Sequence, residues 1–317
     1  MIELKKCRLA EIDFDDRSYP FSCGPVPERL RKSVAAAGIL QPPWLVPGDR
    51  GLVIVSGRRR LAVIRELSRS TAAFSEISYL DVADRDPEEL FLEVCWENAG
   101  IREFNPVESA DLFLAAESRS LEGRERKRLF SALGIPDRPR FHQRCRAIAG
   151  FPALLREMIA AGRVDGETIE LLAAWSTDDL VALVDLAIDF NLRRNKLREV
   201  AGRLDDLACR DRIPVSAVIA ACRQAVADDP GGDQVSTLRR CLKERLYPHL
   251  TSAWKNFIAR REGLSLPAAI RLEPPPDFEG GDYRLSFSFD GARQWREIVG
   301  KLNALTSEEI DELCRRP

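Results

Sequence analysis

Histidine is scarce in this sequence, and its cysteines are scattered. There are two histidines and eight cysteines among 317 residues, and no two cysteines form a C-x-x-C pair. A structural zinc site needs clustered Cys and His ligands, and a disulfide framework needs regularly spaced cysteines in an oxidising compartment. The sequence therefore predicts neither kind of site.

Long apolar runs are also missing. No segment reaches the roughly 18 to 20 apolar residues that a membrane-spanning helix requires. The first residues, MIELKKCRLAEID, lack the apolar core of a secretory signal. With 45% hydrophobic and 31% charged residues, the chain is long enough for two or three domains with their own cores. We expect a cytoplasmic protein with no membrane partner.

The formal net charge of −2 hides an uneven distribution. Residues 123–163 contain ten Lys or Arg and three Asp or Glu, a net charge of +7, so the remainder of the chain carries −9. A basic segment in an acidic chain indicates binding to phosphates. The alternative is a solvated helix face that is rich in arginine.

The first hundred residues alternate short strands and helices. Residues 27–38 begin with proline, carry apolar residues at helical spacing and end in glycine, which predicts a helix. Residues 51–55, GLVIV, predict a short buried strand, and residues 61–67 predict the helix that follows it.

Three adjacent arginines stand between this strand and this helix, in the stretch VSGRRRLAVIR. A chain that leaves a strand through Gly57 and enters a helix presents N–H groups at the positive end of the helix. The guanidinium groups of residues 58–60 fit phosphate oxygens in a bidentate way. The turn therefore predicts a polyphosphate site. The alternative is surface ion pairing with carboxylates such as Glu66 or Asp81.

A carboxylate and an amide stand together at Glu97 and Asn98, in the stretch ENAGIREFNPVESA of residues 97–110. Oxygen ligands of this kind suit Mg²⁺, which binds through one or two protein groups plus substrate phosphates. Further along, Asn105-Pro106 predicts the start of a helix with Asn105 as its cap.

Three motifs in this order resemble the ParB/Noc/KorB partition proteins. They are GILQP at residues 38–42, SGRRRLAV at 56–63 and ENAGIREFNPVESA at 97–110. The corresponding family boxes are G-x-x-Q-P, G-E-R-R or G-H-R-R, and E-N-x-x-R…N-P-x-E. The resemblance covers residues 1–110 by motif and the following helical region more loosely. It implies a nucleotide-binding domain that takes CTP with Mg²⁺, closes as a clamp on DNA, and works beside a Walker-type ATPase in DNA segregation.

The resemblance also implies roles for individual residues. The predicted nucleotide-binding residues are Gln41, Gly57, Arg58, Arg59, Arg60, Glu97, Asn98 and Arg102. Two of them, Glu97 and Asn98, are also the predicted Mg²⁺ ligands.

Two departures from the family pattern bear on the chemistry. Arg58 stands where many members carry the hydrolytic glutamate, and an arginine cannot act as a base or orient an attacking water in the same way. The arginine after Glu97 and Asn98 comes one position late, with Ile101 in the family's slot and Arg102 next. The first departure counts against hydrolysis, so the prediction is CTP binding with at most weak CTPase activity.

Residues 123–150 predict a helix, a break at residues 134–137, and a second helix opened by Pro139. In a helix-turn-helix the second helix lies in the major groove of double-stranded DNA. The predicted DNA-binding residues are Arg138, Arg140, His142, Gln143, Arg144 and Arg146, and the predicted buried stripe of this helix is Phe141, Cys145 and Ile148. The alternative is a pair of amphipathic helices whose arginines lie in water.

The remaining pattern predicts an α+β multidomain chain. After Asn105-Pro106 it stays helical up to a turn-forming linker and hinge at 228–233, which a helix over 234–261 follows. The predicted domains are a ParB-like α/β domain at 1–106, an all-α helix-turn-helix domain at 107–227, and a helix plus a small ββα module at 234–317.

The predicted ββα module comprises strands at 269–273 and 283–289 and a closing helix at 292–305. A two-stranded ribbon is marginal on its own in water. It therefore either pairs with a second copy, which makes the protein a homodimer, or packs back on the preceding helix around Trp254 and Phe257.

Three functions fit these features. The first is a CTP-responsive DNA clamp for chromosome or plasmid partition, associated with the nucleoid or with a plasmid. The second is a phosphotransfer or redox enzyme on the same fold, as in sulfiredoxin-like or free serine kinase relatives, although no cysteine stands beside the arginine turn. The third is a transcription regulator whose first domain binds no nucleotide.

Overall fold

The computed structural model describes residues 3–19, 22–69, 74–99, 103–119, 121, 123–229, 231, 233–280 and 282–315. The chain divides into two compact units, residues 1–202 and 203–317. The division falls inside helix α10 (Arg194–Asp211). The domain boundaries drawn from the sequence stay predictions.

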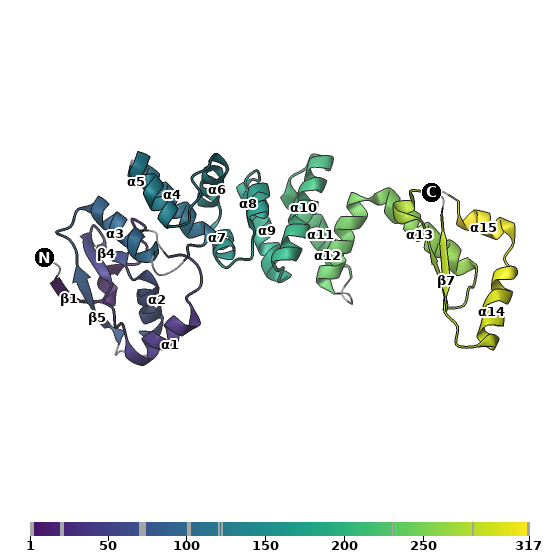
Figure 1. The fold of residues 1–317 in the computed structure, drawn as a ribbon, viewed down its shortest axis with the longest axis horizontal. Coiled ribbons are helices and arrows are strands. Elements are labelled where there is room, and N and C mark those ends of the chain that lie inside the picture. Colours follow the sequence, from purple (N-terminus) through teal and green to yellow (C-terminus); the bar gives the residue numbers. More distant parts are fainter. Residues whose placement is uncertain are drawn as a thin grey trace. The chain divides into compact units, whose positions relative to one another are not determined.

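A mixed five-stranded sheet, with strand order β1-β5-β3-β4-β2, forms the amino-terminal part of the first unit (Figure 1). Its strands are β1 (Glu3–Arg8), β2 (Ile12–Asp13), β3 (Trp44–Gly48), β4 (Gly51–Ser56) and β5 (Glu76–Asp81). Along this order the pairings are antiparallel, parallel, antiparallel and parallel. The strand predicted at 51–55 is therefore β4, and its position inside the sheet explains its apolar sequence.

Helices α1 (Glu28–Ala37) and α2 (Arg58–Leu67) pack against each other. Their apolar stripes supply Val34 and Leu61 to the core that contains Leu45 and Ile54 of the sheet. The helix predicted over 27–38 is confirmed as α1. The helix predicted over 61–67 begins at Arg58 instead, so the three arginines form the first turn of α2.

Helix α3 (Pro87–Ala99) leads toward α4 (Pro106–Ser118). The side chain of Asn105 accepts hydrogen bonds from the N–H groups of Val107 and Glu108, and the Glu108 side chain accepts from the N–H of Asn105. This reciprocal capping box, with Pro106 in the first turn, fixes where α4 begins. The predicted cap is confirmed.

The helical pattern predicted after Asn105-Pro106 is confirmed, because the described residues between 106 and 229 contain no strand. The helices that follow α4 in the first unit are α5 (Gly123–Ala132), α6 (Pro139–Gly150), α7 (Ala153–Ala160), α8 (Gly166–Leu172) and α9 (Thr177–Asp189). α4 packs on α6 and α7, and α6 also packs on α8. Phe113 of α4 is fully buried beside Phe130 of α5.

The second unit contains α11 (Val215–Ala227), α12 (Gln234–Leu246), α13 (Pro248–Gly263), β6 (Ile270–Glu273), β7 (Arg284–Phe287), α14 (Ala292–Asn303) and α15 (Ser307–Leu313). α11 and α12 pack together, and Asp229 accepts hydrogen bonds from Thr237 and Arg240. The helix predicted over 234–261 breaks before Pro248, which has no N–H to continue it.

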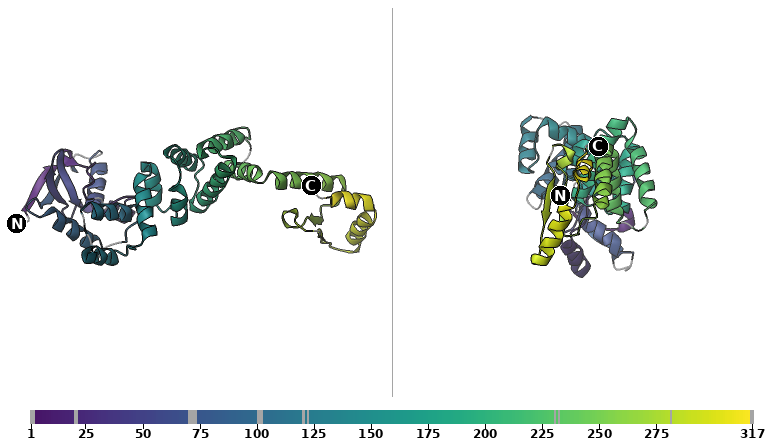
Figure 2. Two further views of the ribbon diagram at one scale, coloured as in Figure 1. Left: turned by 90° about the horizontal axis from the view of Figure 1, so that it is seen from above. Right: turned by 90° about the vertical axis from the view of Figure 1, so that its right-hand side faces the viewer.

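The carboxy-terminal elements of the second unit are the yellow segments of Figures 1 and 2. β6 and β7 pair antiparallel, so the two predicted strands and the closing helix are confirmed as elements. No helix in the described ranges combines the length and the apolarity that crossing a bilayer would need.

Candidate functional site

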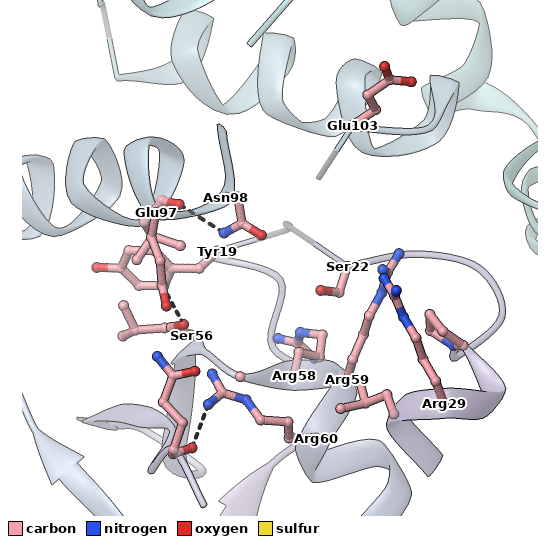
Figure 3. Close-up of a pocket in the computed structure, with 16 residues that line it drawn as sticks. Tyr19, Ser22, Arg29, Ser56, Arg58, Arg59, Arg60, Glu97, Asn98 and Glu103 are labelled. Atoms are coloured by element: carbon pink, nitrogen blue, oxygen red, sulfur yellow. Dashed lines mark hydrogen bonds between the residues drawn. The ribbon is translucent and has the colours of Figure 1, made fainter. Parts of the chain in front are cut away.

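A pocket of about 470 Å³ lies in the first unit where α2 begins (Figure 3). The predicted nucleotide-binding residues that line it are Gln41, Gly57, Arg58, Arg59, Arg60, Glu97 and Asn98. They come from three segments far apart in the sequence: the approach to β3, the first turn of α2, and the end of α3. Arg102 lies outside the described residues. The structure thus brings all the other predicted residues to one cavity.

Gly57 allows the chain to turn from β4 into α2. Its φ of +91° lies in the left-handed region, which glycine adopts without steric cost. A Cβ at this position would lie 2.9 Å from Cβ of Pro43. Glycine also offers no side chain to cap α2. The first-turn N–H groups lie at the positive end of the helix, where an anion is bound favourably.

Replacing Gly57 by alanine is expected to destabilise the first unit by about 1–3 kcal/mol, because a left-handed conformation strains an L-residue. The contact with Pro43 adds to the strain. Urea unfolding of both proteins measures the change. Gly162→Ala is a useful comparison, since Gly162 also has a positive φ, at the end of α7, but no atom within 4 Å of the added Cβ. A smaller loss at Gly57 than at Gly162 would contradict the importance of this close approach.

Arg58 binds the segment that follows β2. Its Nη1 and Nη2 donate to the carbonyl oxygens of Phe14 and Asp16, at 2.9 and 2.6 Å. Burial, with a further contribution from the positive charge of Arg17, lowers the pKa of Arg58 to about 10. Arg58 therefore holds the segment after β2 in place.

The alternative of ion pairing holds for one arginine of the turn, since Arg59 pairs with Glu108, but Glu66 and Asp81 bind other cations. Glu66 instead pairs with Arg31 of α1, and Asp81 accepts a hydrogen bond from Lys5 Nζ at 2.6 Å. Both carboxylates thus bind cationic side chains outside the arginine turn.

Arg59 and Arg60 both line the pocket. Arg59 Nη2 donates to Glu108 Oε1 at 3.0 Å, and Arg60 Nη1 donates to the carbonyl oxygen of Gln41 at 2.5 Å. Burial lowers the pKa of Arg60, and the negative charge of Glu97 partly opposes this shift. Figure 3 shows the side chains of Arg29 and Arg59 running in the same direction, with their guanidinium groups close together. An anion between such groups would relieve their mutual repulsion.

Glu97 and Asn98 occupy the end of α3, where backbone carbonyls favour cations. Ser56 Oγ donates to Glu97 Oε2 at 2.8 Å, and Asn98 Nδ2 donates to the carbonyl oxygen of Val94 at 2.8 Å. In Figure 3 the amide oxygen of Asn98 points away from α3. The described residues contain no cluster of three His, Cys, Asp or Glu side chains that could hold a metal. One carboxylate and one amide oxygen fit a Mg²⁺ whose other ligands are phosphates and water.

Sequence reasoning missed several residues that line the same pocket. They are Tyr19, Ser22, Arg29, Ser56 and Glu103. Arg29 follows Pro27 at the start of a predicted helix, so its place in a helix could be foreseen. Its approach to Arg59 depends on how α1 packs on α2, and no local signal in the sequence carries that information.

The predicted DNA-binding residues lie at the start of α6 and along it. Arg138, Arg140, Gln143 and Arg146 are exposed, whereas His142 and Arg144 are half-buried. In the predicted stripe, Cys145 and Ile148 are buried and Phe141 is half-buried. α6 therefore has a packed face and a polar face, as a helix that enters a groove requires.

Several of these arginines form ion pairs with acidic residues of other helices. Arg140 donates to both oxygens of Glu170 in α8, at 2.8 and 2.5 Å, and Arg144 donates to Glu170 Oε1 at 2.6 Å. The hydrogen bonds from Arg140 and Arg144 lower the pKa of Glu170 to about 2. Arg146 pairs with Glu117 of α4 at 2.7 Å. These carboxylates occupy positions that phosphate groups could take.

His142 faces the interior of the helical region. Its ring stacks on Phe113 with centroids 4.6 Å apart, and its Nε2 lies 2.8 Å from Asp137, which also binds Arg126. Asp137 thereby links α5 to α6 across the turn, a role that the spacing of the sequence does not indicate.

No family model matches the chain, and no curated protein matches it. Among solved structures, it is similar to the C-terminally truncated chromosome-partitioning protein ParB from Caulobacter crescentus complexed with CTP-gamma-S. The identity is 15% over 59% of this chain and 99% of that one, with a TM-score of 0.27. The same protein complexed to the centromeric parS site gives 16% identity over 62% and 98%, with a TM-score of 0.29.

A Pnob8-like ParB-N domain gives 16% identity over 80% of this chain and 97% of that one, with a TM-score of 0.30. Identities and TM-scores this low establish neither a family nor a common fold. The resemblance to partition proteins therefore rests on the three motifs and on the pocket they form.

Proposed function

We propose that this chain is a ParB-like DNA-binding protein of chromosome or plasmid partition, which binds CTP with Mg²⁺ in the pocket at the start of α2. The observation that carries the proposal is the convergence of the three motifs. Gln41, Arg60 and Glu97 come from different motifs, yet they line one cavity.

The pocket has complementary ends for a nucleotide and its metal. The first turn of α2 supplies positive N–H groups and guanidinium groups to a triphosphate. The end of α3 supplies Glu97 and Asn98 to Mg²⁺, which would neutralise phosphate charge when bound. Gln41, whose carbonyl oxygen accepts from Arg60, lies beside the same space.

CTP would be bound and not rapidly hydrolysed. Arg58 occupies the position of the family's hydrolytic glutamate, and its guanidinium group donates to Phe14 and Asp16. A guanidinium group is already protonated and has no acceptor, so it cannot take a proton from an attacking water. Nucleotide binding would then act as a switch that is reset by release of CTP.

The polar face of α6 would bind double-stranded DNA. Arg138, Arg140, Gln143 and Arg146 are the exposed candidates for base and phosphate contacts. Phosphates would replace Glu170 and Glu117 as the partners of Arg140, Arg144 and Arg146. The protein would accordingly be associated with the nucleoid or a plasmid, where a Walker-type ATPase would be its partner.

The carboxy-terminal module would make the protein a homodimer. One set of its side chains packs on α13, where Phe257, Leu272 and Leu313 form a small core. Another set is exposed: Phe289 and Trp295 lie in edge-to-face contact, with centroids 4.8 Å apart, and both are more than 40% exposed. A second copy would cover these aromatic side chains and the free edge of β7.

Replacing Trp295 by serine is expected to shift the chain from dimer to monomer, because Trp295 is a large exposed apolar group of this face. Sedimentation equilibrium measures the change in mass. Leu154→Ser, which removes an apolar side chain of similar exposure from the first unit, should leave the dimer intact. A Trp295→Ser protein that stays dimeric would contradict the proposed interface.

A transcription regulator without nucleotide binding is the second candidate. It is favoured by the protein partners that the arginine turn already has, namely two backbone carbonyls for Arg58, Glu108 for Arg59 and the Gln41 carbonyl for Arg60. The two candidates differ in whether a nucleotide changes DNA binding.

Fluorescence anisotropy with labelled duplex DNA tests the proposed function. We expect binding that weakens steeply with salt, because counterion release from phosphates dominates the affinity. We also expect CTP with Mg²⁺, but not ATP or GTP, to change the amount or lifetime of the complex. DNA binding that is indifferent to all three nucleotides would favour the transcription regulator.

A further inference from the structure

Glu108 is a buried carboxylate at the foot of the arginine turn. The residue is 1% exposed. Its Oε1 accepts hydrogen bonds from Arg59 Nη2 and from the N–H of Cys23, both at 3.0 Å, and its Oε2 accepts from the N–H of Asn105 at 3.1 Å. Burying a carboxylate costs several kcal/mol unless donors replace its water. These three donors do so.

The three donors belong to segments that lie far apart in the sequence. Arg59 lies in the first turn of α2, Cys23 lies in the segment before α1, and Asn105 caps α4. The carbonyl oxygen of Cys23 also accepts from Asn105 Nδ2 at 2.9 Å, and it lies 3.5 Å from Arg59 Nη2. One carboxylate and one peptide group therefore join the pocket to the start of α4.

Capping α4 needs only one of the two oxygens of Glu108. In a capping box, the acidic side chain returns to the N–H of the cap residue, and Oε2 does this. Oε1 instead accepts from Arg59 and from the N–H of Cys23. The second oxygen thus acts on the predicted phosphate site rather than on the helix.

We propose that Glu108 is a positioning residue of the nucleotide site, which orients the guanidinium group of Arg59 toward the phosphates of the bound nucleotide. This inference rests on the proposed function. A guanidinium group has five N–H donors in a rigid plane, so Arg59 can bind Glu108 and a phosphate at once. Fixing one edge of the group before binding reduces the side-chain entropy lost when the nucleotide arrives.

The same contact makes nucleotide binding and the start of α4 energetically linked. α4 carries Phe113, which packs against Phe141 and His142 of α6. A phosphate that holds Arg59 also holds Glu108 in its capping position. Linkage is reciprocal, so loosening the start of α4 through Glu108 weakens nucleotide binding.

A double-mutant cycle between Glu108→Gln and Arg59→Ala, with CTP affinity measured by calorimetry, tests the proposal. Glutamine keeps the size of the side chain and removes its charge. We expect Glu108→Gln to weaken CTP binding about tenfold when Arg59 is present, which is the scale of one charged hydrogen bond. In the Arg59→Ala background the same change should alter the affinity less than about twofold, because the group it positions is gone.

Asn105→Ala controls for the helix cap. It removes the acceptor for the N–H groups of Val107 and Glu108 and the donor to the Cys23 carbonyl, but it keeps the N–H that Glu108 Oε2 accepts. It should lower the melting temperature with a smaller loss of CTP affinity than Glu108→Gln. If Glu108→Gln does not fold, Glu108→Asp, which keeps the charge on a shorter side chain, supplies the same comparison.

The outcomes separate the two proposals. The positioning role is overturned if Glu108→Gln weakens CTP binding equally with and without Arg59, or if Asn105→Ala weakens CTP binding as much as Glu108→Gln does. Either result would leave the proposed function standing. If the unmodified chain binds no nucleotide, the proposed function fails, and the role of Glu108 fails with it.

Discussion

Replacing Arg60 by alanine is expected to abolish CTP binding. The guanidinium group of Arg60 is half-buried in the pocket, with Gln41 on one side and the charge of Glu97 nearby. In the proposed site Arg60 would make two charged hydrogen bonds to phosphate, each contributing about 1.5–3 kcal/mol, so the affinity should fall about a hundredfold or more. Isothermal titration calorimetry with CTP and Mg²⁺ measures this loss.

Arg69→Ala is the matched control, since it removes the same charge just beyond the other end of α2 and Arg69 is exposed. It should bind CTP as the unmodified chain does. Arg60→Lys should recover only part of the affinity, because an ammonium group cannot bind two oxygens in the planar geometry of a guanidinium. Equal CTP affinity in Arg60→Ala and the unmodified chain would refute the site.

Replacing both Arg140 and Arg144 by glutamine is expected to weaken duplex DNA binding about a hundredfold at moderate salt, since each phosphate or base contact contributes about 1–3 kcal/mol. The slope of the logarithm of affinity against the logarithm of salt concentration should become shallower by about 1 for each phosphate that the variant no longer neutralises. Fluorescence anisotropy across a salt series measures both quantities.

The control for this pair is a second double variant, Arg8→Gln with Arg50→Gln. It removes the same net charge from exposed residues in the region of the sheet, which bind Glu11 and Asp13. Its DNA affinity and salt slope should stay close to those of the unmodified chain. The helix-turn-helix proposal fails if both double variants weaken binding equally, because the effect would then follow overall charge and not α6.

The sequence predicted those elements whose signals are local. The proline and glycine around α1, the β-branched run of β4 and the Asn105-Pro106 cap of α4 each determine structure within a few residues. β1 and β5 were not predicted individually, because their pairing joins residues 3–8 to residues 76–81. The position of α2 was predicted less well, since three arginines carry no apolar periodicity to mark the first turn of a helix.

Spacing predicted which residues reach the pocket but not how their side chains are directed. Arg58, Arg59 and Arg60 are adjacent in sequence, yet one binds a loop, one binds Glu108 and one binds the Gln41 carbonyl. Their acceptors lie 19 to 49 residues away, so only tertiary packing brings them together. The same holds for Glu170, which lies 26 and 30 residues from the two arginines that it binds.

The most direct test of the central claim is a calorimetric titration of the unmodified chain with CTP, ATP and GTP in the presence of Mg²⁺, with and without duplex DNA. If the first turn of α2 binds the triphosphate of a nucleotide, CTP will give saturable heat and will bind more tightly than ATP or GTP. Absence of saturable binding by all three nucleotides, in both conditions, would contradict the claim.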